Sequence, residues 1–166
     1  MFFNDKSKIE IIYIIKEHIK TLKVFGSEKI RVNDISIFFI VPIFIALILV
    51  LNMEIDDTRI GIIVTAFTIF IGLLFNILAI LLAFDSQRNK EVDKKFIKEV
   101  LYNVSFSIII SILVLIVSII RFINLEWYGY FLLDFILFYL MTVFILTLFM
   151  VLKRLFNLLV KKIDNM

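Results

Sequence analysis

The chain has 166 residues, about the length of one domain, and its composition excludes an ordinary soluble protein. Hydrophobic residues make up 62% of it, against roughly 45–50% in globular domains. Cysteine is absent and histidine occurs once, which excludes disulfides and leaves little scope for a metal site or a catalytic triad. No phosphate-binding loop, nucleophile elbow or zinc-protease motif occurs. We therefore expect no enzyme, no cofactor and no metal.

The first segment, residues 1–34, is expected to be a cytoplasmic amphipathic helix rather than a signal peptide. Charged residues interrupt its isoleucines, and no small-residue cleavage site follows, so we treat the chain as mature. Ser7–Glu10 is typical of a capping box, and the helix should end near Gly26. Lys16, Lys20 and Lys23 share its basic face. Two placements stay open: on the membrane surface, or packed on the other cytoplasmic helices.

Four apolar runs follow, and each is predicted to cross the bilayer as a helix. A helix needs about 20 residues to cross the hydrocarbon core, and unpaired backbone cannot face lipid. The predicted fold is therefore all-α, a four-helix transmembrane bundle over residues 35–166. The expected spans are about 35–53, 60–84, 104–123 and 130–152.

The distribution of basic residues predicts the orientation of these spans. Of the 18 lysine and arginine residues, 16 lie in the first segment, the loop between spans two and three, and the C-terminal tail. Only Arg59 and Arg121 lie in the other two loops. Because cytoplasmic loops are enriched in basic residues, both termini should be cytoplasmic. Glu91–Asn103 and Leu155–Ile163 are expected to prolong spans three and four as cytoplasmic helices.

The second span carries one stripe of small or weakly polar residues on an otherwise Ile/Leu/Phe helix. Close packing of small residues drives helix association in lipid, so this stripe should face protein. Three interpretations stay open: packing within the protomer, a subunit interface, and the wall of a water-filled pore. The stripe comprises Gly61, Thr65, Thr68, Gly72, Asn76, Ala79 and Ala83.

A second weakly polar stripe lies on span three, at Asn103, Ser107, Ser111 and Ser118. Serine hydroxyls often bond their own helix backbone, which favours packing, although a pore wall is the alternative. We expect no buried ion pair, which favours a narrow pore over a coupled transporter.

Two single residues within the spans invite separate interpretations. Asp134, within about one turn of the outer end, is expected to be interfacial, with a cation-attracting pore mouth as the alternative. Pro42 near the middle of span one predicts a kink, either structural or a gating hinge.

The basic cytoplasmic residues lie near aromatic ones, a combination that binds single-stranded nucleic acid or a nucleotide messenger. Topology and anionic lipid headgroups are the simpler explanations. The candidate regulator-binding residues are Lys16, Lys20, Lys23, Arg88, Lys90, Lys94, Lys95 and Lys98.

The segment Phe67–Gln87 (FTIFIGLLFNILAILLAFDSQ) resembles part of small membrane effectors of bacterial anti-phage defence, of the Hailong channel type. The resemblance rests on Leu73–Asn76 (LLFN), on Asp85 at the cytoplasmic exit and on the charged helix that follows, about a fifth of the chain. It implies a bacterial inner-membrane channel, homo-oligomeric and tetrameric. It also implies closure by short single-stranded DNA oligomers made by a partner nucleotidyltransferase.

From the sequence we expect a homo-oligomeric channel-like effector that depolarises or permeabilises the inner membrane when triggered from the cytoplasm. Its setting would be abortive infection. The alternative is a non-conducting anchor or regulatory subunit for a partner protein. A small exporter is disfavoured by the lack of a central ionisable residue.

Overall fold

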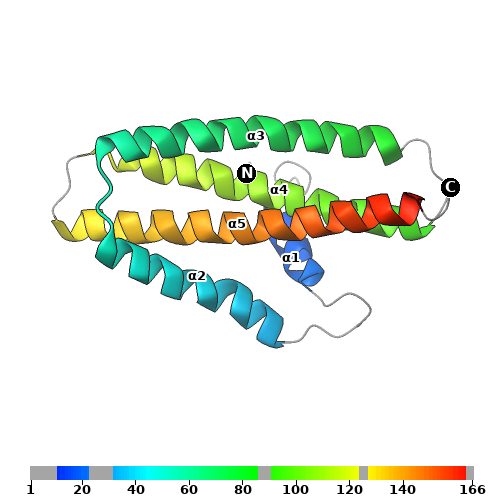
Figure 1. Cartoon of the computed structure of the whole chain (residues 1–166), viewed down its shortest axis with the longest axis horizontal. Coiled ribbons are helices and arrows are strands. Elements are labelled where there is room, and N and C mark those ends of the chain that lie inside the picture. Colours follow the sequence, from blue (N-terminus) through cyan, green and yellow to red (C-terminus); the bar gives the residue numbers. More distant parts are fainter. Residues whose placement is uncertain (1–10, 23–31, 86–90, 124–126, 164–166) are drawn as a thin grey trace, which may run out of the picture.

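The computed structural model describes residues 11–22, 32–85, 91–123 and 127–163, and all regular structure in these ranges is helical (Figure 1). The all-α prediction is thus confirmed. The Ser7–Glu10 capping box lies outside the described residues. The five helices are α1 (Ile11–Thr21), α2 (Val32–Asn52), α3 (Asp57–Asp85), α4 (Glu91–Ile120) and α5 (Trp127–Ile163).

Two long helices, α4 and α5, lie side by side and form the centre of the molecule. On this pair, α3 packs mainly along α4, while α2 packs on α5 and diverges from it toward its own N-terminal end (Figure 1). The short helix α1 packs on α4 and lies across the long helices rather than along them.

Three helices are long and apolar enough to cross a membrane: Asp57–Leu81 in α3, Ile97–Ile120 in α4 and Gly129–Phe156 in α5. The apolar part of α2 that is described, Phe38–Asn52, is shorter. Outward-facing side chains on α2 are large and apolar, including Phe44, Ile48 and Leu51, as expected of a helix in lipid. These features make the chain a membrane protein by length and composition.

The buried residues on the packing face of α3 follow a heptad pattern. Ile60, Phe67, Leu74 and Leu81 are buried and recur every seven residues. A repeat of seven keeps one seam of a helix against its neighbour over many turns, which explains why α3 runs along α4 for most of its length.

Pro42 lies inside α2, which continues through it as one helix. Its ring is buried, and it stands four residues from buried Phe38 and four from buried Ala46, so these three share one side of the helix. Proline removes one backbone hydrogen bond but is tolerated in such helices where neighbours pack against it. Pro42 therefore contributes to the contact face of α2.

The four predicted spans lie in four separate helices, although α2 ends at Asn52 and α4 at Ile120, one and three residues before the predicted ends of spans one and three. The predicted extension Glu91–Asn103 forms the first part of α4 without interruption, and α5 continues through Leu155–Ile163.

Candidate functional site

The small-residue stripe of α3 faces away from its own protomer. Six of its members are exposed, and the side chain of the seventh, Ala83, is outside the described set. A Cβ atom placed on Gly61 or Gly72 would meet nothing within 4 Å. The stripe is thus not packed inside the protomer, contrary to one of the three sequence interpretations. The exposed members are Gly61, Thr65, Thr68, Gly72, Asn76 and Ala79.

The packing seam and the small-residue stripe lie on opposite sides of α3. Successive residues are 100° apart around an α-helix, which places the stripe roughly opposite the heptad seam that packs on α4. The buried seam is large and apolar, whereas the outward surface carries the small stripe with large apolar residues beside it, including Ile62, Leu73 and Ile80. The large outward residues suit lipid, while the small and weakly polar stripe beside them suits close contact with another helix.

Hydrogen bonds within α3 satisfy two of the stripe's three polar side chains. The Thr65 hydroxyl donates to the Gly61 carbonyl oxygen at 2.9 Å, and the Thr68 hydroxyl to the Val64 carbonyl oxygen at 2.8 Å. Among the described residues the Asn76 amide has no hydrogen-bond partner. Asn76 stands nine residues before Asp85, about 13 Å along the helix, within the apolar stretch.

The weakly polar stripe of α4 lies inside the protomer. Asn103, Ser107, Ser111 and Ser118 are all fully buried. The Ser107 hydroxyl donates to the Asn103 carbonyl oxygen at 3.0 Å, and that of Ser111 to the Ser107 carbonyl oxygen at 2.8 Å. Their own helix therefore satisfies Ser107 and Ser111, as the packing interpretation expected, whereas the Ser118 hydroxyl has no partner among the described residues. The α3 and α4 stripes do not share one space within the protomer.

A buried ion pair joins the residue that follows α4 to helix α5 at the end of the bundle opposite α1, here called the far end. Arg121 Nε donates to Asp134 Oδ1 at 2.8 Å, and both side chains are largely buried. The same guanidinium reaches the Ile55 carbonyl oxygen at 3.2 Å and stands 4.0 Å from the centre of the Tyr130 ring. The expectation of no buried ion pair was wrong, because Arg121 folds back onto Asp134. With its charge already paired, Asp134 is a poor candidate for a cation-attracting pore mouth.

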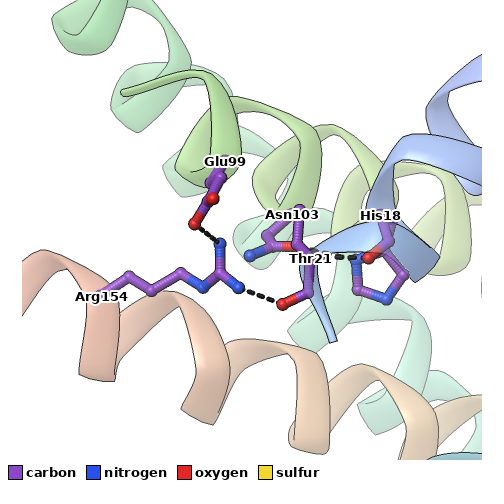
Figure 2. Close-up of polar contacts among 5 residues, drawn as sticks. All are labelled: His18, Thr21, Glu99, Asn103 and Arg154. Carbon is purple, nitrogen blue, oxygen red and sulfur yellow. Dashed lines mark hydrogen bonds and ion pairs between the residues drawn. The ribbon is translucent and has the colours of Figure 1, made fainter. Parts of the chain in front are cut away.

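A second polar cluster lies where α1 crosses α4 and α5 (Figure 2). His18 Nδ1 donates to Asn103 Oδ1 at 2.8 Å, and the Thr21 hydroxyl lies 2.6 Å from the same oxygen. Beside them Arg154 binds the Thr21 carbonyl oxygen and pairs with Glu99 at 2.7 Å. Three helices are thus joined by five side chains. We call this set the α1 clasp: His18, Thr21, Glu99, Asn103 and Arg154.

The imidazole of His18 is fully enclosed. It stacks on Phe106 with ring centres 3.8 Å apart and contacts Phe38 at 5.6 Å. Burial lowers its pKa to about 4; the hydrogen bond with Asn103 opposes this shift and the nearby positive charge of Arg154 adds to it. His18 is therefore neutral at physiological pH. Its Nε2 atom and the Asn103 Nδ2 atom have no partner among the described residues.

The predicted regulator-binding residues are only partly described. Lys16 and Lys20 on α1 and Lys98 on α4 are exposed, and Lys20 pairs with Glu17. Lys94 and Lys95 belong to the first turns of α4, where side chains are outside the described set. Lys23, Arg88 and Lys90 lie outside the described residues altogether.

Sequence reasoning missed the α1 clasp. His18 and Thr21 lie on the same side of α1 as Leu22, so two polar residues interrupt its apolar face. That interruption is a local signal for a buried polar contact. Their partner Asn103 is 85 positions from His18, and no local pattern identifies it. Within the described residues no group of His, Asp and Glu could hold a metal ion.

No family model matches the chain, and neither a curated protein nor a solved structure matches it.

Proposed function

We propose that this protein is a homo-oligomeric, channel-like membrane effector whose copies meet along the exposed stripe of α3. One observation carries the proposal: the Asn76 amide is exposed and unpaired on a helix apolar enough to cross a membrane. In hydrocarbon, an amide without partners costs several kcal/mol. A second copy or a water-filled lumen would remove that cost, and lipid would not.

The small residues around Asn76 support contact between copies. Gly72 and Gly61 leave open space beside α3, into which the backbone of a neighbouring helix fits closely. Around a closed ring of copies, Asn76 from each would meet near the axis. Amide groups there would keep a narrow path wet, while the surrounding Leu and Phe side chains would form the hydrophobic gate.

The proposed topology has four spans with both termini in the cytoplasm of a bacterial inner membrane. It counts α2 as the fourth span, since its 21 residues extend about 31 Å. The concentration of basic residues in the first segment, the α3–α4 connection and the tail supports the orientation.

The regulator would be a polyanion bound at the end of the bundle where α1 packs, here called the basic end. Lys16, Lys20 and Lys98 are exposed there and available to phosphates. The resemblance to Hailong-type effectors suggests a short single-stranded DNA or nucleotide messenger from a partner nucleotidyltransferase, a tetrameric assembly, and depolarisation during abortive infection. These details rest on that resemblance alone.

A second candidate is a non-conducting anchor or regulatory subunit. Burial of the α4 serines within the protomer favours it, because this removes one of the two expected pore walls. In that case the α3 stripe would contact a helix of the partner protein.

Ion flux distinguishes the two candidates. Purified protein in liposomes should carry potassium ions, detected by an entrapped potassium-sensitive dye. Asn76→Leu should reduce the rate of potassium flux at least about tenfold, because water would leave the apolar constriction. Asn76→Ser is the matched control, because it keeps a polar group at the same place and should retain most of the flux. If neither wild type nor a variant with Lys16, Lys20 and Lys98 replaced by glutamine carries ions, the channel proposal fails and the anchor replaces it.

A further inference from the structure

The α1 clasp fixes how α1 is rotated about its own axis. His18 and Thr21 point toward Asn103, and Arg154 holds the last carbonyl of the helix (Figure 2). With these contacts made, α1 has one orientation against α4. The side chains on its remaining sides therefore have defined directions.

Those remaining sides form two adjacent strips. At 100° per residue, Ile11, Ile15, Ile19 and Ile12 lie next to the packed side, and Lys16 and Lys20 follow. Ile12 is 83% exposed and Ile11 42%. Ile15 and Ile19 are half-buried, and Ile15 packs against the core, so the exposed part of the strip is mainly Ile11 and Ile12. This exposed strip is unfavourable in water. Beside two lysines it matches a helix that lies in the membrane interface.

The position of α1 in the fold matches the level of a membrane surface. It lies across the long helices, hence along a bilayer that those helices cross (Figure 1). Its last carbonyl accepts from Arg154, which in turn pairs with Glu99, and both charged residues lie near the ends of the two apolar stretches Ile97–Ile120 and Gly129–Phe156.

Aromatic residues mark the same level. Tyr13 on α1 meets Tyr102 on α4, with hydroxyls 3.3 Å apart and rings edge to face. Tyrosines are enriched where spans leave the hydrocarbon. On the helical wheel Tyr13 and Glu17 lie opposite the isoleucine strip, on the side that would face water.

From these contacts we infer that α1 is a membrane-surface helix whose isoleucine strip enters the lipid and whose Lys16 and Lys20 bind anionic phospholipid headgroups. The clasp holds the helix at this depth, and the lipid covers the strip that the protein leaves open. The inference requires only that the protein be in a membrane, and it holds whether or not the protein conducts ions.

Tryptophan quenching by brominated lipid tests this placement in the full-length protein. In a Trp127→Phe background, Ile12→Trp should be quenched strongly by bromines on the acyl chains of reconstituted vesicles. It should be shielded from iodide in the water. Tyr13→Trp is the matched control on the opposite side, and it should show the reverse pattern.

The headgroup preference is tested in the same vesicles. Brominated phosphatidylglycerol in unlabelled phosphatidylcholine should quench Ile12→Trp at least about twofold more than brominated phosphatidylcholine in unlabelled phosphatidylglycerol, at equal bromine content. Combining Lys16→Gln with Lys20→Gln should abolish the difference. Equal quenching with both lysines present would overturn headgroup binding.

Two further outcomes would overturn the placement of the helix. If iodide quenches Ile12→Trp and bromolipids do not, the strip faces water. If neither quenches it, another protein surface, such as a second copy, covers the strip.

Discussion

At the scale of single residues, each end of the bundle contains a set of buried polar side chains that contact one another. At one end the α1 clasp includes a neutral histidine, and at the far end Arg121 and Asp134 share a charge pair. Removing one member of such a set leaves its partner buried without compensation, which is why these contacts define one arrangement of the helices.

The docking of α1 should weaken in acid. Because the pKa of His18 falls from 6.5 to about 4 on burial, undocked α1 binds a proton in that window and docked α1 does not. The docking free energy should therefore drop by about 3 kcal/mol as the pH falls from about 6.5 to about 4. Protection of the α1 backbone amides from hydrogen exchange, corrected for the pH dependence of intrinsic exchange rates, measures this drop in docking free energy. In His18→Asn the protection should be weaker at neutral pH but constant across this window, and the same pH dependence in both proteins would contradict the assignment.

The far-end ion pair should behave as a buried pair. Asp134→Asn leaves the Arg121 charge without its partner and should lower stability by on the order of 3 kcal/mol. The measurement is thermal unfolding in detergent. Replacing both residues by leucine should recover most of the loss, because no unpaired charge remains. If the double variant is as unstable as Asp134→Asn, packing rather than charge pairing accounts for the effect.

At the scale of helices, α3 combines a seam for its own protomer with a second face for something outside it. The seam residues are large and recur every seven positions, while the outward side carries a stripe of small residues with the unpaired Asn76, beside exposed large apolar residues. A larger side chain placed at the stripe should leave the fold of the protomer unchanged and weaken only the association between copies.

Gly72→Leu tests this separation of faces. A Cβ at Gly72 meets nothing in the protomer, so its unfolding should be unchanged, while contact between copies should lose about 1–3 kcal/mol. Chemical crosslinking in membranes measures the oligomer yield. Leu73→Phe adds bulk to the neighbouring exposed residue, 100° away around the helix, and should matter much less. Equal oligomer yields for the two variants would show that copies do not meet at Gly72.

The helices themselves could be predicted from the sequence, because long apolar runs have few alternatives to helix in lipid. The run from Ile60 to Phe84 falls entirely within α3. Which side of α3 contacts α4 was harder to predict, since small residues pack both inside a protomer and between copies. The ion pair of Arg121 with Asp134 was missed for a different reason, because it needs the chain to reverse direction between the two residues.

At the scale of the whole molecule, the fold has a basic end at α1 and a far end where α2 leads into α3 (Figure 1). If the far end is outside the cell, Asp57→Cys and Glu126→Cys should react with an impermeant maleimide on intact cells, and Asn89→Cys should not. The chain has no native cysteine, so each reporter is unambiguous. Labelling of Asn89→Cys before lysis would reverse the proposed orientation.

The central claim is that copies of this protein meet along the stripe of α3, and a cysteine scan of that helix tests it most directly. Single cysteines would be introduced from Gly61 to Ala79, and disulfide-linked dimers measured after oxidation in native membranes. We predict maxima at the stripe positions and little dimer from Phe67 or Leu74, which are buried within the protomer. Maxima elsewhere on the helix, or none at any position, would contradict it.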